Sequence, residues 1–143
     1  MAKIDDLRFL AGQWAGWASQ SPLDWMHFLD TASRMYRYSF SDQLMIHGQR
    51  PDATACASLE IWNTKLNRWV NRGAKGIALI DDNQQPARLR YVFDVSDTHA
   101  RYGVPPPYIW RLEQRHVAPL LAHLAYTYSL PDASSMQAAL SQI

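Results

Sequence analysis

The stretch that decides the fold is "LNRWVNRGAKGIALID", Leu66–Asp81. It ends in the short apolar run "GIALI", which predicts a buried strand. The turn-forming residues "DDNQQP" follow, and then "RLRYVFDV", residues 88–95, alternates as a half-buried strand does. The two runs predict an antiparallel hairpin. We expect its apolar face to carry Leu89, Tyr91 and Phe93. The opposite, polar face should be lined by arginine and carry Arg88, Arg90 and Val92.

Helical signals precede this hairpin. Residues 22–38 are expected to form an amphipathic helix, with Ser21 as N-cap, Pro22 in the first position and Asp24 in a capping box. Its apolar residues recur every three or four positions, which predicts one buried face: Trp25, Phe28, Leu29, Ala32 and Met35.

Further helices are expected on either side of the hairpin. A short one should be capped by Ser41 and stopped by Gly48, and a third should start near Ser58. Pro119 is expected to open a C-terminal helix, and residues 131–143 to form another. Their expected buried residues are Leu120, Leu121, Leu124 and Tyr128 in the first and Met136, Leu140 and Ile143 in the second. The predicted class is α+β: a helical N-terminal layer packed on a small antiparallel sheet, with C-terminal helices.

Composition is typical of one globular domain over residues 1–143, because 48% of the chain is hydrophobic. The single cysteine, Cys56, allows no internal disulfide, and no stretch is long enough to span a membrane, so we expect a cytoplasmic protein. The chain stops at Ile143 without a C-cap signal, which suggests a fragment of a larger protein whose other domains are partners.

The positive charge of the chain is concentrated in one part of the sequence. The net charge is only +1, yet residues 31–75 hold seven Lys or Arg against three Asp or Glu. Four of these cations lie within eleven positions with no acid between them: Lys65, Arg68, Arg72 and Lys75. Lys and Arg neutralise phosphates, Trp69 could stack on an unpaired base, and glycines let backbone N–H groups approach an anion. The alternative is an ordinary surface turn with Trp69 in the core.

"RMYRYSF" interleaves arginine with Tyr36, Tyr38 and Phe40, a pattern that suits single-stranded nucleic acid. The alternative is a helix end fastened to the core, and we expect at least two of these three aromatics to be buried. Arg88 and Arg90 of the hairpin are further candidates for phosphate contact.

The sequence contains no specific catalytic or metal-binding pattern. "FDVSDTH" places Asp94, Asp97 and His99 close together, but their spacing matches no specific ligand set. "GAKG" lacks the length and the Ser or Thr of a phosphate-binding P-loop, and no HExxH motif occurs. We therefore expect no catalytic residue, no metal and no cofactor.

The stretch "YSFSDQLMIHGQRPDATACASLEIWNTKLNRWVNRGAKGIAL" resembles the N-terminal domain of ArdC-type antirestriction proteins, and the related domain that opens large helicase and methyltransferase polyproteins of conjugative elements. The resemblance covers residues 36–97. Asn67 stands where the family commonly has Gly, and because asparagine tolerates the left-handed conformation we expect the turn to survive there. Asp42 stands where the family usually has Asn, which puts an acid near the proposed anion site. The positions that match the family pattern are Gln43, Trp62, Arg72, Gly73, Lys75 and Gly76.

The resemblance implies non-catalytic binding of single-stranded DNA, and possible binding of double-stranded DNA, in a mobile-element context. The zinc protease domain of ArdC-type proteins is not implied, because its motif does not occur here. The rival interpretation is a protein-interaction domain that docks neighbours through exposed aromatics and the "PPP" segment, and a weaker one is a metal-dependent enzyme around Asp94, Asp97 and His99.

Overall fold

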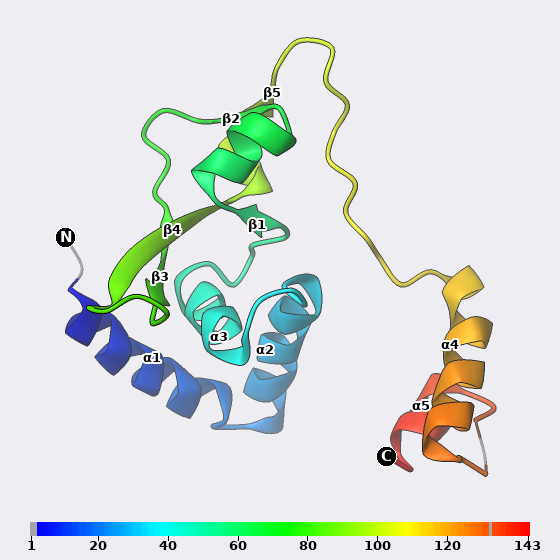
Figure 1. The fold of residues 1–143 in the computed structure, drawn as a ribbon. Coiled ribbons are helices and arrows are strands. Elements are labelled where there is room, and N and C mark those ends of the chain that lie inside the picture. The colour runs from blue at the N-terminus through cyan, green and yellow to red at the C-terminus, as the bar shows by residue number, and fades with distance from the viewer. Residues whose placement is uncertain (1–2, 132) are drawn as a thin grey trace. The chain divides into compact units, whose positions relative to one another are not determined.

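The computed structural model describes residues 3–131 and 133–143, and the chain divides into two compact units, Met1–Pro107 and Tyr108–Ile143. The second unit contains α4 (Gln114–Tyr128) and α5 (Met136–Leu140). The first contains, in order, α1 (Ile4–Ala18), α2 (Pro22–Arg34), α3 (Phe40–Gln49), β1 (Cys56–Ala57), a π-helical turn (Ile61–Lys65), β2 (Arg68–Val70), β3 (Ile77–Asp81), β4 (Arg88–Asp94), a 3₁₀ turn (Val95–Asp97) and β5 (Thr98–Ala100) (Figure 1). The predicted mixed class, with small antiparallel sheets and helices at both ends of the chain, is confirmed.

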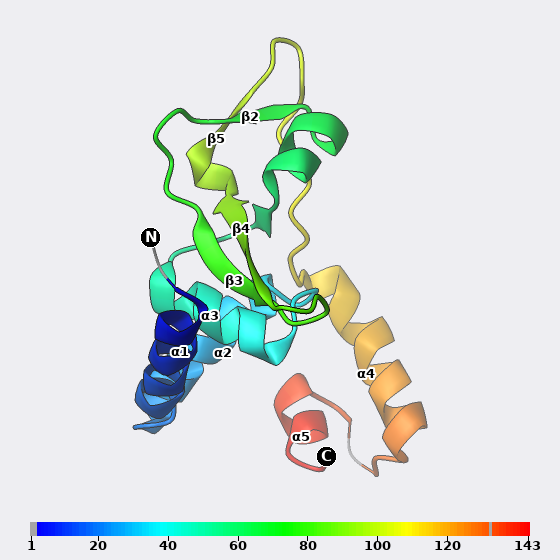
Figure 2. The same cartoon turned by 60° about the vertical axis from the view of Figure 1, so that its left-hand side comes forward.

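Two small antiparallel sheets organise the first unit. The predicted hairpin is present as β3 and β4, in a register that pairs Ile77 with Val92 and Asp81 with Arg88. Strand β1 adds to the other edge of β4, and β2 pairs with β5 in a separate two-stranded ribbon. Figures 1 and 2 show α1, α2 and α3 together on one side of the β3–β4 hairpin.

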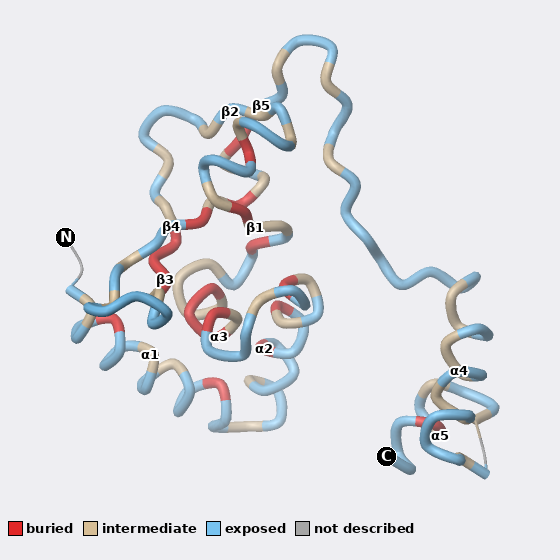
Figure 3. The backbone as a smooth tube through the Cα atoms, viewed as in Figure 1, coloured by how far each residue is buried: buried red, intermediate tan, exposed pale blue. Residues whose placement is uncertain are grey.

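The main core lies between these helices and the hairpin, where Figure 3 shows buried backbone in α3, β3 and β4. Its buried members come from six separate parts of the chain: Leu7, Met35, Met45, Ile46, Ala53, Ile77, Ala78, Leu79 and Val92. Helix α1 had no counterpart in the sequence prediction, although Leu7, Ala11, Trp14 and Ala18 recur at helical spacing and face the core.

Gln49 ties the helical layer to the sheet. Its side-chain Nε2 donates to the Ala78 carbonyl oxygen at 2.9 Å, and its Oε1 accepts from the Ala78 N–H at 2.9 Å. Strand β3 is an edge strand, so its outer backbone groups need such partners.

Helix α2 begins as predicted but ends earlier and buries a narrower stripe. Ser21 accepts a hydrogen bond from the Asp24 N–H, and Pro22 occupies the first turn. Phe28 and Met35 are buried as expected, with Thr31 between them on the same stripe. The predicted burial of Trp25 and Leu29 is wrong: these side chains are 41% and 46% exposed, because they flank that stripe on a helix with neighbours on one side only.

Helix α3 differs from its prediction at both ends. Ser39 caps it, because its hydroxyl accepts from the Asp42 N–H at 3.2 Å, so Ser41 lies inside the first turn. Gly48 does not stop the helix. It is a point of close packing, because a Cβ there would lie 2.1 Å from the Trp14 ring.

The two faces of β4 are used differently from the prediction. Val92 is buried in the main core, and Arg90 forms an ion pair with Asp42 of α3, so this face meets the helices. The opposite face leaves Tyr91 42% exposed. The expected assignment is therefore correct in part: Leu89 packs against the main core and Arg88 and Arg90 are exposed. It is wrong for Tyr91, which is exposed, and for Val92, which is buried.

The C-terminal unit also differs from its prediction. Helix α4 begins at Gln114, because Glu113 and His116 form a capping box, so Pro119 lies inside the helix. Leu120, Leu121 and Leu124 are half-buried, whereas Tyr128 is exposed. In α5 the buried residue is Ala139. Leu140 and Ile143 are exposed, because the helix packs through the face that carries Ala139.

Candidate nucleic-acid interface

The basic stretch of the sequence forms an anchored loop between β2 and β3, and Figure 3 shows it exposed over most of its length. The Asn71 N–H donates to the Asp97 carbonyl at 2.8 Å, and the Ala74 N–H closes a turn on the Asn71 carbonyl at 3.0 Å. Gly73 has φ 84°, a left-handed conformation that favours glycine, and the space beside its Cα is open. The backbone at Gly73 is therefore accessible to an approaching anion.

Arg72 and Lys75 project from this loop with uncompensated charge. Both are exposed. Within residues 3–131 and 133–143, neither side chain has an ion pair or a hydrogen bond. Unpaired cations on an anchored turn can contact phosphate without first breaking an internal salt bridge.

The β2–β5 ribbon separates the neighbouring predicted residues by strand alternation. Arg68 turns inward across the ribbon, where its Nε donates to Thr98 Oγ1 at 2.8 Å and its Nη2 donates to the Thr98 carbonyl at 3.2 Å. Trp69 lies on the other face and is 46% exposed. The alternative that placed Trp69 in the core is therefore wrong, and Arg68 is a structural residue of the ribbon.

The Trp69 face carries three polar partners that the sequence analysis did not select for this site. The Arg101 guanidinium lies over the indole ring, 3.8 Å from its centroid, within cation–π range. His99 is the cross-strand partner of Trp69, and its Nδ1 lies 2.6 Å from Asn71 Oδ1. The only sequence signal for this arrangement is the two-residue spacing of His99, on β5, and Arg101, just after that strand.

Asn67 starts the ribbon in a left-handed conformation, with φ 50°. Asparagine tolerates this region better than most residues, so the turn survives at a position where the resembled family commonly has glycine, as expected. The Arg101 N–H donates to the Asn67 carbonyl at 3.4 Å, which continues the ribbon beyond its last paired residues.

Tyr91 provides a second exposed aromatic beside the loop. A Cβ on Gly76 would lie 3.1 Å from the Tyr91 Cβ and 3.2 Å from the Phe93 ring. Gly76 therefore lets the end of the loop lie against Tyr91, next to Lys75. Trp69 precedes the cationic loop in the chain, and Tyr91 lies against Gly76 at the end of the loop.

Several predicted binding residues have hydrogen-bond or ion-pair partners within the fold. Trp62 is 1% exposed and its Nε1 donates to the Phe93 carbonyl at 2.9 Å. Gln43 Nε2 donates to the Met35 carbonyl at 3.0 Å at the end of α2. Arg90 forms an ion pair with Asp42, the acid that stands where the resembled family usually has asparagine. Each of these side chains therefore makes a contact that stabilises the fold, and Arg90 remains 41% exposed beside its partner.

The aromatics of "RMYRYSF" are arranged opposite to expectation. Tyr38 is half-buried, and its hydroxyl donates to the Cys56 carbonyl at 2.8 Å. Burial raises its pKa to about 12, with a smaller contribution from Cys56. Tyr36 and Phe40 are 58% and 60% exposed, so the prediction that at least two of the three are buried is wrong.

Lys65 and Arg88 are exposed but lie apart from each other. Lys65 ends the π-helical turn just before β2. Arg88 pairs in register with Asp81 at the turn end of the hairpin, whereas the basic loop enters at the opposite end. Of these two, Lys65 is the one that lies next to the ribbon in the chain.

The residues of "FDVSDTH" are each engaged in the fold. Asp94 is buried and accepts from the N–H groups of Thr54, Ala55 and Ser96 and from the Ser96 hydroxyl. Burial alone would raise its pKa, but these hydrogen bonds together hold the pKa below its ordinary value. Asp97 pairs with Arg50 at 2.9 Å.

Across the described ranges 3–131 and 133–143, no three His, Cys, Asp or Glu side chains are grouped as metal ligands would be. Burial, with a smaller effect of Asp94, raises the pKa of the Cys56 thiol to about 12, so at neutral pH the thiol is protonated.

Comparison of the chain with known protein families, with curated proteins and with solved structures gave no match. Within the part of the chain that the structure describes, no helix combines the length and apolar character needed to cross a membrane.

Proposed function

We propose that this protein binds single-stranded nucleic acid, most readily single-stranded DNA, without catalysis, through the β2–β5 ribbon and the loop that follows it. The observation that carries the proposal is the exposed Trp69, stacked with Arg101, beside a loop whose Arg72 and Lys75 are unpaired. The resemblance to ArdC-type domains supports the same chemistry in a cytoplasmic, mobile-element setting.

Each part of this surface fits a different part of a single strand. Arg72 and Lys75 supply positive charge for successive phosphates, and the open backbone at Gly73 adds N–H donors. Trp69 and Tyr91 are exposed aromatic rings on which unpaired bases could stack, because every base has a π-face. In a duplex the bases are already stacked on one another, so only the phosphate contacts would remain.

Sequence preference is expected to be weak. The surface consists of two short strands and a loop, and no helix of this interface is available to enter a major groove. His99 and Asn71 are hydrogen-bonded to each other, so base-edge contacts would compete with that bond.

The test is a titration of labelled oligonucleotides, single- and double-stranded, at several salt concentrations. Each cation that contacts phosphate of a single strand contributes about 0.7 to the slope of log affinity against log salt. Arg72→Ala with Lys75→Ala should therefore weaken binding for all sequences and reduce the slope by up to about 1.4.

Lys3→Ala with Arg8→Ala is the control, because it removes the same number of positive charges at the N-cap and in the first turns of α1, where Arg8 pairs with Asp82. It should leave the slope unchanged. Unchanged affinity of the Arg72/Lys75 variant, with the fold intact, would leave the loop as an ordinary solvated turn.

A second function, docking to another protein or to a neighbouring domain, is favoured by one specific observation. Helix α2 exposes Leu23, Met26 and Leu29, which with His27 and Asp30 line a shallow groove. Apolar docking predicts little salt dependence, whereas binding through phosphate predicts a steep one. The same salt titration therefore separates the two functions.

A further inference from the structure

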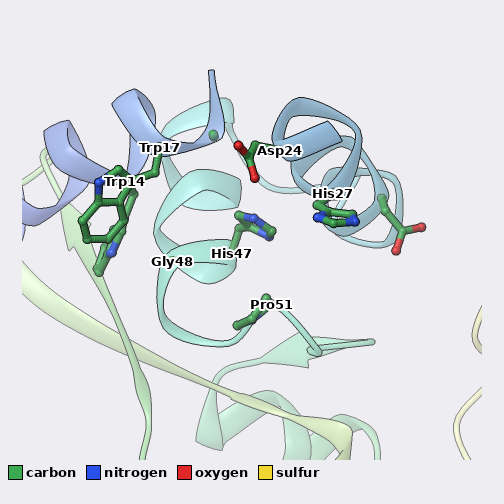
Figure 4. Close-up of a pocket in the computed structure, with 9 residues that line it drawn as sticks. Trp14, Trp17, Asp24, His27, His47, Gly48 and Pro51 are labelled. Carbon is green, nitrogen blue, oxygen red and sulfur yellow. The ribbon is translucent and has the colours of Figure 1, made fainter. Parts of the chain in front are cut away.

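A second hollow lies on the helical side of the first unit, away from the residues proposed to bind nucleic acid. It has a volume of about 420 Å³, within the range of small-molecule sites. Figure 4 shows Asp24, His47 and Pro51 between Trp14 on one side and His27 on the other. Its lining residues come from α1, α2, α3 and the segment after α3: Trp14, Trp17, Ala18, Asp24, His27, Asp30, His47, Gly48 and Pro51.

Two indole side chains form the aromatic wall. Trp14 packs against Gly48, where any Cβ would collide with its ring, so the glycine fixes how closely α1 approaches α3. Trp17, one helical turn later, is 59% exposed. Indole faces attract cations more strongly than other aromatic side chains do.

The two carboxylates of the pocket differ in charge compensation. Asp30 is paired with the Arg34 guanidinium at 2.7 Å. Asp24 accepts the Ser21 hydroxyl at 2.7 Å, but no cation pairs with it among the residues the structure describes. One negative charge in the pocket is therefore without a counter-ion.

His47 adds an acceptor rather than a charge. Its Nδ1 lies 2.7 Å from Thr31 Oγ1, and that hydroxyl is also placed to donate to the Pro51 carbonyl at 3.3 Å. A hydroxyl has one proton, so both bonds form only if His47 Nδ1–H donates to Thr31, which leaves Nε2 with a free lone pair. Burial, with the nearby His27 and Arg34, lowers the pKa of His47, so the ring is neutral at pH 7.

We propose that this pocket binds an organic cation that carries a guanidinium or primary ammonium group, either as a small molecule or as a basic side chain of a peptide. The cationic group would sit between the Asp24 carboxylate and the indole faces, and donate hydrogen bonds to Asp24 and to His47 Nε2. An apolar ligand would leave the Asp24 charge uncompensated, and an anion would be repelled by it. None of these residues belongs to the proposed nucleic-acid interface, so the proposed cation site can be tested independently of nucleic-acid binding.

The test compares two probes that differ only in side-chain charge, Nα-acetyl-argininamide and Nα-acetyl-citrullinamide. Binding is followed by the shifts of the tryptophan indole N–H signals in NMR spectra of the full chain. The arginine probe should bind at least about fivefold more tightly, which corresponds to about 1 kcal/mol. Agmatine separates the two sources: equal binding of agmatine indicates a free small cation, and a clear preference for the amide-blocked probe indicates a peptide side chain.

Variants assign the effect to the pocket. Asp24→Asn keeps a polar group beside Ser21 but removes the charge, and should abolish the preference for arginine over citrulline. Trp17→Leu, at an exposed position, should weaken the arginine probe roughly threefold. Asp6→Asn, which removes an exposed acid from α1 outside the pocket, should change neither result.

The pH dependence provides a further readout. The charged and titratable groups of the pocket are Asp24, His27, Asp30 with its partner Arg34, and His47. Lowering the pH through the lowered pKa of His47 adds positive charge to the pocket, so the arginine probe should bind more weakly below that pKa than at pH 8. Equal binding of the two probes, no binding of either, or an unchanged preference in Asp24→Asn would overturn the proposal.

Discussion

Substitution of Trp69 is the most direct test of the proposed binding of nucleic acid. We expect Trp69→Leu to weaken binding of a single-stranded oligonucleotide while leaving the domain folded. Leucine keeps apolar bulk on the ribbon but has no aromatic face, so it removes stacking specifically. Trp69→Phe, which restores a ring, should recover most of the affinity.

The expected losses of affinity and of stability follow from base stacking and from the buried area of Trp69. Stacking on an aromatic side chain contributes about 1–3 kcal/mol per base, so the leucine variant should lose roughly 5- to 150-fold in affinity. Trp69 is 46% exposed, so about 135 Å² of its roughly 250 Å² is covered, worth at most about 3.4 kcal/mol at ~25 cal/mol per Å². Leucine retains part of that burial, so the cost in stability should be about 1 kcal/mol.

Two measurements on the same samples are needed: fluorescence anisotropy with a labelled oligothymidine, and thermal unfolding followed by circular dichroism. Trp17→Leu is the matched control, because Trp17 is an exposed tryptophan, 59% against 46% for Trp69, but lies on α1. It should leave the oligonucleotide affinity unchanged. Equal affinities of the leucine and phenylalanine variants at position 69, or a loss that only follows unfolding, would refute stacking by this ring.

Three further predictions concern the scaffold. Arg68→Ala should lower the unfolding temperature and leave the salt slope of binding unchanged, because Arg68 holds β2 to Thr98; a reduced slope would make it a phosphate contact. Asp94→Asn should cost about 1–3 kcal/mol at pH 7, since it puts a donor against backbone N–H groups. The lowered pKa of Asp94 means that its contribution is present above about pH 4 and is lost as the pH falls through the folded-state pKa, so acid titrations of wild type and variant should converge. Gly48→Ala should destabilise the domain despite the better helix propensity of alanine, because the new Cβ would collide with Trp14; a raised unfolding temperature would show that Trp14 moves freely.

Local signals in the sequence determined a substantial part of this protein. Ser21 and Pro22 predicted the start of α2, and the turn residues between two apolar runs predicted the β3–β4 hairpin. These features depend on residues close in sequence, whose hydrogen bonds and dihedral preferences act before any tertiary contact forms. Asn67 in the left-handed region belongs to the same class.

The direction of individual side chains was decided only by the tertiary structure. Strand periodicity shows that Arg68 and Trp69 point to opposite faces, but it does not show which face meets solvent. Two tryptophans seven positions apart, Trp62 and Trp69, therefore ended in opposite environments, 1% and 46% exposed. The Trp62 indole found a buried carbonyl partner on β4, and the sequence contains no local sign of it.

The candidate site itself depends on a long-range pairing. Strand β5 places His99 beside Trp69, and Arg101 over its ring, from about thirty residues further along the chain. Composition identified a basic loop with an aromatic neighbour, because charge and ring chemistry are properties of the residues alone. The pairing of β2 with β5 decided which cation meets that ring, because the register of two strands is set by the packing and hydrogen bonds of the whole domain.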